Sequence, residues 1–339
     1  MRTTLPEPRG PVSERFVAGA CHGVWVAPEL DGIDPLVDDD LHLALWCAYQ
    51  LHHGGFHGVA EDLEWDPSAI GFRRLLEVAF EGALRAEHRP EQLPADPATA
   101  LRVIEEWSSP PLSRWLGSHG HLAHVRDFAI HRSAYQLKEA DGHTWGLPRL
   151  AGRTKSTVVE IQMDEYGLGR PGQAHAELFA AAMEELGLDP AFGRYVGLLP
   201  GTTLATDNLL CLFGLNGRLR GALVGHLAHF EMSSPAAMRR YREAARRLGL
   251  PALARFYDVH AEIDVHHGRI ALDHAVRPLA EEEPALAADI TFGAAALHHV
   301  EVRFARHLLD CWRRREPTLL ADPTTTAPTA VAPALGPAP

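Results

Sequence analysis

Residues 255–270 read RFYDVHAEIDVHHGRI, and this stretch decides both the fold class and the candidate site. An α-helix turns by about 100° per residue, so His260, Asp264 and His267 fall within roughly 60° of one another on one helix face. Imidazole and carboxylate groups together suit iron, manganese or zinc. The segment therefore predicts a helix that offers three metal ligands to one point.

The same spacing also fits a solvent-exposed face on which Asp264 makes a weak ion pair with a histidine. Ile263 and Ile270 flank the polar face and continue an apolar stripe. A helix side bordered by apolar residues is turned towards a core, where buried polar groups need partners. This favours the metal-binding interpretation over the exposed one.

One helix cannot complete a site for two metal ions, so other helices must contribute inward side chains. Glu231 follows the apolar run GALVGHLAHF, whose small residues permit close helix packing. Glu139 follows another helical segment, and Glu165 and His175 bracket the turn YGLGRPG. Surface positions are the alternative for the three glutamates, and a structural core position is the alternative for His175.

The rest of the chain supports an all-α fold. Asp38 and Asp66 are candidate N-caps of the first two helices. β-branched residues are sparse, and no Asn-Gly or Asp-Gly turn joins two alternating runs. Further helices are expected over about 100–106, 115–140, 148–166, 172–186, 202–230, 235–248, 251–276 and 284–312.

Composition divides the chain into three parts. Residues 1–38 are rich in Pro, Gly and Asp and are predicted to be an N-terminal arm. Residues 39–316 are predicted to form the helical domain. Residues 317–339 consist mainly of Thr, Ala and Pro with almost no charge, so we predict a disordered tail.

Composition and charge also exclude several function classes. Apolar residues make up 46% and charged residues 22% of the 339 residues, as in ordinary globular proteins. The formal charge of -12 argues against a nucleic-acid partner, which would require a basic face. The sequence has no apolar run of about 18 residues and no apolar signal core, so we expect no membrane partner and a cytoplasmic location.

The use of cysteine and histidine narrows the kind of metal site. The four cysteines lie far apart without a CxxC pair, which argues against a disulfide framework or a zinc knuckle. The 21 histidines exceed ordinary usage, and a metal site is one reason for such an excess. Two further histidine clusters lack the spacing of structural zinc sites and receive no role, namely His52, His53 and His57, and His119, His121 and His124.

Four segments together resemble the ordered ligand motifs of haem-oxygenase-like di-iron oxidases, the iron-containing redox enzymes. They are LKEAD at 137–141, DEYGLGRPGQAHAELF at 164–179, HLAHFE at 226–231, and the spacing of the histidines and aspartate at 260–267. The resemblance covers about residues 40–312. It implies a haem-oxygenase-like helical bundle with auxiliary N-terminal helices.

The resemblance also assigns the ligands of two irons. Six basic ligands are implied, with Glu139 or Glu231 bridging or capping the pair: Glu139, His175, Glu231, His260, Asp264 and His267. Glu165 matches an extra carboxylate, similar to the seventh ligand of N-oxygenating members, which makes it both a metal ligand and the candidate catalytic residue. Asp164, Asp258 and Glu262 are candidates for orienting the histidines.

By this resemblance the chain is an O2-dependent non-haem di-iron oxidoreductase. It would oxidise a small organic substrate, with N-oxygenation of an amine or amino acid as one expected reaction, and would take electrons from an external donor. A homodimer is left open. The alternatives are a di-iron desaturase, decarboxylase or C–C cleaving oxidase, a metal-free helical interaction or regulatory protein, and a haem oxygenase with one axial histidine.

Overall fold

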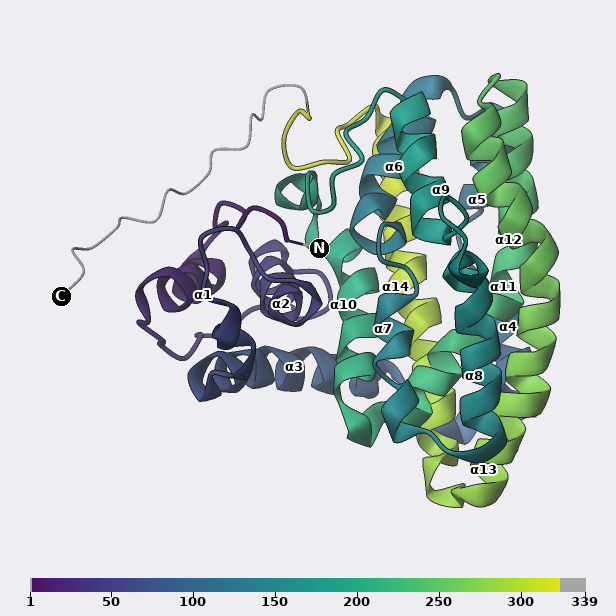
Figure 1. Cartoon of the computed structure of the whole chain (residues 1–339), viewed down its shortest axis with the longest axis horizontal. Helices are drawn as coiled ribbons and strands as arrows, with labels where there is room; N and C mark the ends of the chain where they lie inside the picture. The colour runs from purple at the N-terminus through teal and green to yellow at the C-terminus, as the bar shows by residue number, and fades with distance from the viewer. Residues whose placement is uncertain (1, 324–339) are drawn as a thin grey trace.

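The computed structural model describes residues 2–323, and these form a helical bundle with a smaller group of helices on one side (Figure 1). Within this range the only extended pairing is an isolated bridge between Thr3 and Phe56, so the predicted all-α fold is confirmed. The α-helices are α1 (Pro11–His22), α2 (Asp39–His53), α3 (Pro67–Glu87), α4 (Pro97–Glu105), α5 (Leu112–His119), α6 (Leu122–Gln136), α7 (Asp141–Thr144), α8 (Gly152–Glu165), α9 (His175–Glu185), α10 (Gly201–Leu215), α11 (Arg220–Arg247), α12 (Pro251–Ile270), α13 (Arg277–Glu282) and α14 (Ala287–Arg314). A π-helical segment, Ala271–Val276, joins α12 to α13.

The two predicted N-caps are confirmed. The Asp38 carboxylate accepts hydrogen bonds from two backbone N–H groups at the start of α2, including that of Leu41 at 2.8 Å. Asp66 does the same for α3, accepting from Ala69 at 3.0 Å, and Pro67 takes the first helical position. Each cap satisfies donors that a helix start leaves without an intrahelical partner.

The helix expected over 202–230 is divided in the structure. It breaks at Asn216, whose backbone is extended and whose side-chain amide donates to the Leu212 carbonyl at 2.9 Å. The expectation of one continuous helix was wrong because an asparagine can cap the end of a helix with its own side chain. Likewise, the segment expected over 115–140 divides at Gly120 into α5 and α6.

The expected break before Pro235 is absent, and α11 runs through this proline. Proline lacks the N–H that would bond to the carbonyl of Glu231 four residues earlier. The Ser234 hydroxyl lies 3.3 Å from that carbonyl, but its single proton is donated in the shorter bond of 2.6 Å to Asp264. Glu231 therefore lies in the middle of a long helix and not at the end of one.

The predicted N-terminal arm contains a helix that its composition did not indicate. Val12 and Phe16 of α1 are buried, and the Phe16 ring lies 6.0 Å from that of Phe72 on α3. Figure 1 shows α1, α2 and α3 together at one side, where α2 packs against α10. The arm thus forms part of an auxiliary helical group.

The predicted tail begins at residue 317, and its first residues pack against the bundle. Thr318 is buried, and its hydroxyl donates to the Asp127 carboxylate at 2.7 Å. The backbone N–H of Leu320 donates to the Leu198 carbonyl at 2.9 Å. The remainder of the predicted tail, residues 324–339, lies outside the described residues.

The long helix α11 lies between α12 and α14 and forms the centre of the bundle (Figure 1). Its contact with α14 depends on two glycines. A Cβ atom on Gly225 would lie 1.9 Å from the Ile290 carbonyl oxygen, and one on Gly293 would lie 1.9 Å from the Ala222 carbonyl oxygen. Only glycine permits this close approach of two helix backbones.

Within the described range, no helix combines the length and apolar character needed to cross a membrane.

This crossing leads to a stability prediction. Gly225→Ala should lower the free energy of unfolding by about 1–3 kcal/mol, because the added methyl group forces α11 and α14 apart. Gly82→Ala is the matched control, since Gly82 is exposed on α3 and a Cβ there would have no other atom within 4 Å. It should raise stability by up to about 1 kcal/mol. Urea unfolding measures both, and equal effects of the two substitutions would contradict the crossing geometry.

Candidate metal centre

The seven predicted ligands come from five places in the chain and meet in the interior. Glu139 follows α6, Glu165 ends α8, His175 begins α9, Glu231 lies within α11, and α12 carries the remaining three. All seven side chains are buried, with 7% or less of each residue exposed. The structure therefore brings together residues that are far apart in the sequence, by 128 positions for Glu139 and His267.

The ligand atoms form two groups that share one residue. In the first group, single ligand atoms of four residues lie within 4.8 Å of one another: Glu139, Glu165, His175 and His260. In the second group the same holds for Glu165, Glu231 and His267. Glu165 belongs to both groups, so its carboxylate lies where it can contact two metal ions.

Distances between individual atoms show the same convergence. His175 Nδ1 lies 2.8 Å from a Glu165 oxygen, and His260 Nε2 lies 3.4 Å from a Glu139 oxygen. His267 Nδ1 lies 3.4 Å from a Glu231 oxygen. Each pair places an imidazole nitrogen opposite a carboxylate oxygen, as two ligands of one metal ion would be placed.

Seven buried polar atoms of this cluster face one another without a well-aligned hydrogen bond. Leaving a buried polar atom without a partner is costly, so such atoms in one place indicate a ligand. The atoms concerned are both carboxylate oxygens of Glu139, Oε2 of Glu165, Nδ1 of His175, Nε2 of His260, Oδ1 of Asp264 and Nδ1 of His267. Their mixture of carboxylate oxygen and imidazole nitrogen fits iron.

Two histidines are oriented by hydrogen bonds on the side away from the cluster. His260 Nδ1 lies 2.8 Å from the Phe256 carbonyl oxygen, to which it donates when neutral. His267 Nε2 lies 3.0 Å from an Asp164 oxygen. These bonds leave Nε2 of His260 and Nδ1 of His267 free to bind metal. Of the three candidates for this orienting role, only Asp164 has it, since Asp258 pairs with surface arginines and Glu262 is exposed.

Asp264 lies on the same helix face but belongs to neither ligand group. One of its oxygens accepts a hydrogen bond of 2.6 Å from the Ser234 hydroxyl, while the other has no partner. Burial and the neighbouring Glu165 charge raise its pKa to about 6, although His260 and Ser234 act in the opposite direction. Its role as a ligand stays a prediction.

The protonation of the cluster reflects crowded, buried charges. Burial and the Asp264 charge raise the pKa of Glu231 to about 8. Burial alone would lower the pKa of His260, but the Glu139 carboxylate outweighs it and raises the value to about 10. In the same way, Glu231 raises the pKa of His267 to about 9, whereas burial opposes it. Without metal, bound protons therefore compensate part of the negative charge of the carboxylates.

Glu165 behaves differently from the other carboxylates. Burial would raise its pKa, but the charge of His175 and those of His260 and His267 outweigh it and hold the pKa at about 2. Glu165 is thus ionised even when Glu231 is protonated. An ionised carboxylate between two sets of imidazoles is suited to bridge two cations.

Sequence reasoning missed the residues that close the small cavity beside the ligands. This cavity, of about 10 Å³, is lined by Tyr135, His143, Gln162 and Phe230 together with ligand residues. His143 Nε2 lies 3.1 Å from His226 Nδ1, and burial lowers the pKa of His143 to about 4. No periodic signal could identify His143, because the turn at residues 137–140 interrupts the helical register before α7.

The histidines of the two additional clusters belong to neither ligand group. His124 contacts the rings of Trp115 and Trp312, and His52 contacts that of Trp65. Across residues 2–323, no third group of three potential ligand residues is present. These clusters therefore still receive no role.

Comparisons with known proteins agree with this geometry. A family model described as an iron-containing redox enzyme matches residues 126–302, a stretch that contains every candidate ligand. A nitrosourea synthase from Streptomyces achromogenes subsp. streptozoticus is 28% identical over 174 residues, which are 51% of this chain and 37% of that protein. The chain thus matches little more than a third of this relative's length.

The shared position of Glu165 yields a prediction about metal content. Glu165→Ala should reduce bound iron to one ion per chain or fewer, because it removes a ligand atom from both groups. Glu160→Ala, on the exposed side of the same helix, is the matched control and should bind as much iron as the unaltered chain. Iron is measured by elemental analysis after anaerobic loading. An iron content of the Glu165 variant equal to that of the unaltered chain would show that Glu165 is not a ligand of both irons.

The raised pKa values lead to a pH prediction. Glu231 and His267 hold protons at pH 7 without metal, since their pKa values are about 8 and about 9. Metal must displace these protons, so ferrous iron should bind more tightly as the pH rises from about 6 to about 8. Calorimetry in buffers of different ionisation enthalpy would detect the proton release. Affinity that is independent of pH would contradict the assignment of these ligands.

Proposed function

Because the chain belongs to the family of iron-containing redox enzymes, we propose that it holds two irons in this centre and uses O2 to oxidise a small organic substrate. Family membership establishes an oxidoreductase and a haem-oxygenase-like bundle, as predicted, and sets aside the metal-free interaction protein. The observation that carries the two-iron proposal is the presence of Glu165 in both ligand groups. A carboxylate shared in this way is expected for a pair of adjacent cations.

When bound, the two ferrous ions would supply the electrons that activate O2. The protein's own contribution is to hold the ligands in place before metal arrives. Phe256 and Asp164 fix the rings of His260 and His267, and Ser234 fixes one oxygen of Asp264. Since every ligand is buried, water is largely excluded, and electrostatic interactions in the site are strong.

The expected reaction is oxygenation of nitrogen. The name of the nitrosourea synthase states that it makes a nitrosourea, in which a nitrogen carries a nitroso group. The presence of Glu165, the extra carboxylate of the predicted ligand set, in both groups of potential ligands supports this proposal. We propose an amine or amino acid nitrogen as the acceptor and an external electron donor for the irons. A homodimer and a cytoplasmic location stay predictions.

Isotope labelling tests the reaction class. The ferrous protein is mixed with 18O2 and a panel of primary amines and amino acids, and products are identified by mass spectrometry. We expect a product in which labelled oxygen is bound to nitrogen. The His267→Ala variant, which loses a ligand of the second group, should give none.

Other products would indicate that the protein catalyses one of the alternative reactions. Loss of two hydrogens would indicate a desaturase, loss of carbon dioxide a decarboxylase, and two shorter fragments a C–C cleaving oxidase. O2 consumption no greater than that of metal-free protein, for every compound tested, would contradict the oxidase proposal itself.

A further inference from the structure

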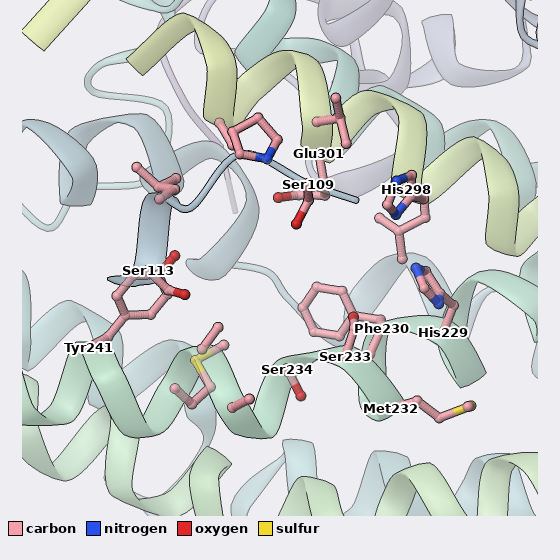
Figure 2. A pocket seen from close by; sticks show the side chains of 18 of the residues that line it. Ser109, Ser113, His229, Phe230, Met232, Ser233, Ser234, Tyr241, His298 and Glu301 are labelled. Carbon is pink, nitrogen blue, oxygen red and sulfur yellow. The ribbon is translucent and has the colours of Figure 1, made fainter. Parts of the chain in front are cut away.

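A second, larger cavity lies next to the metal centre. Its volume is about 370 Å³, and it is enclosed by α6, α11, α14 and the loop before α5 (Figure 2). In Figure 2, Phe230, Ser233 and Ser234 of α11 face Ser109 and Glu301 across this space. A cavity of this size holds a small organic molecule.

Two aromatic side chains separate the cavity from the metal centre. Tyr135 and Phe230 line both the large cavity and the small cavity beside the ligands, and their ring centroids are 5.6 Å apart. The small cavity, of about 10 Å³, has room for no more than about one water molecule. The small cavity is therefore too small for an organic substrate, whereas the large cavity on the far side of this aromatic wall has room for one.

The large cavity contains a preformed ion pair. Arg132 on α6 donates two hydrogen bonds, of 2.8 and 2.6 Å, to the two oxygens of Glu301 on α14. The side chains are 14% and 30% exposed, respectively, so the pair is sheltered but accessible from the cavity. The Arg132 guanidinium also lies 4.2 Å from the centre of the Phe304 ring, which holds it in one orientation.

Each residue of this ion pair can still form hydrogen bonds to a ligand. The two bonds use two of the five N–H donors of a guanidinium, and each carboxylate oxygen has a second lone pair. A ligand with a carboxylate and an ammonium group can thus contact both partners without separating them. A ligand with a single charge would add an uncompensated net charge to a sheltered site whose ion pair is already neutral.

The remaining cavity walls supply little further charge. His229 and His298 line the side opposite Tyr241 in Figure 2. Burial lowers the pKa of His298, so this imidazole is neutral at pH 7. Glu105 is exposed at the outer edge of the cavity. The interior is therefore close to neutral overall, as a ligand without net charge requires.

We propose that this cavity binds the organic substrate as a small zwitterion, with its carboxylate on Arg132 and its ammonium group on Glu301. The proposal rests on the proposed function, because it names the substrate class of that reaction. Tyr135 lies one turn from Arg132 on α6, roughly 5 Å along the helix axis. The end of the molecule remote from the charged groups therefore points towards the aromatic wall and the metal centre behind it, so the nitrogen to be oxidised is a second, uncharged one at that end.

Binding measurements on the unaltered chain test the charge preference. The ferrous protein, kept free of O2, is titrated in a calorimeter with the common L-amino acids. Each is compared with the amine that lacks its carboxylate and the acid that lacks its ammonium group. At least one amino acid should bind about tenfold more tightly than both of its analogues. Binding of an amine or an acid as tight as that of every amino acid would overturn the proposal, and so would an absence of amino acid binding.

A paired substitution locates the binding. The double variant R132Q/E301Q removes both charges but keeps polar side chains of similar size, and it should bind the preferred amino acid about tenfold less tightly. The matched control is R303Q/E87Q, which removes another sheltered ion pair formed by α14, outside the cavity. The control should bind as the unaltered chain does. Equal affinities of the two double variants would place the ligand elsewhere.

The outcomes distinguish this proposal from the proposed function. The calorimeter reads binding without O2, and the comparison of analogues needs no variant. If amino acids fail to bind while labelled oxygen still enters another amine, only the zwitterion site is wrong. If amino acids bind at Arg132 and Glu301 but no O2 is consumed, only the oxidase proposal is wrong.

Discussion

The structure depends on the cost of burying carboxylates and imidazoles at the contact between α11 and α12. Glu231 on one helix faces His267 on the other, and Gly268 lets the backbones approach, since a Cβ there would lie 3.1 Å from the Glu231 carbonyl oxygen. Buried charges are stable only when they are paired or bound to a cation. A metal ion bound to these residues would therefore also stabilise the contact between the two helices.

The same requirement explains the irregular features around the centre. Pro235 leaves the Glu231 carbonyl without its helical donor, and the hydroxyl of the neighbouring Ser234 donates to the Asp264 carboxylate at 2.6 Å. The chain between Glu165 and His175 turns sharply, with Leu168 and several glycines at positive φ. This turn brings Glu165 at the end of α8 and His175 at the start of α9 into the same group of potential ligands, at a cost in backbone strain at Leu168.

Much of this arrangement could be predicted from the sequence, because regular helices obey simple periodicity. The face shared by His260, Asp264 and His267 follows from the pitch of one helix, and the caps Asp38 and Asp66 follow from side-chain chemistry. The helix end at Asn216 was not predictable, since a local hydrogen bond decides it, and neither was the continuity of α11 through Pro235. His143 and the cavity lined by Arg132 and Glu301 depend on how distant helices pack, which periodicity does not specify.

The central claim is that two irons lie on either side of Glu165. Anomalous X-ray diffraction at the iron absorption edge, from crystals loaded with ferrous iron without O2, tests it most directly. The account predicts two peaks per chain, one among Glu139, Glu165, His175 and His260 and one among Glu165, Glu231 and His267. A single peak, or iron bound away from Glu165, would contradict it.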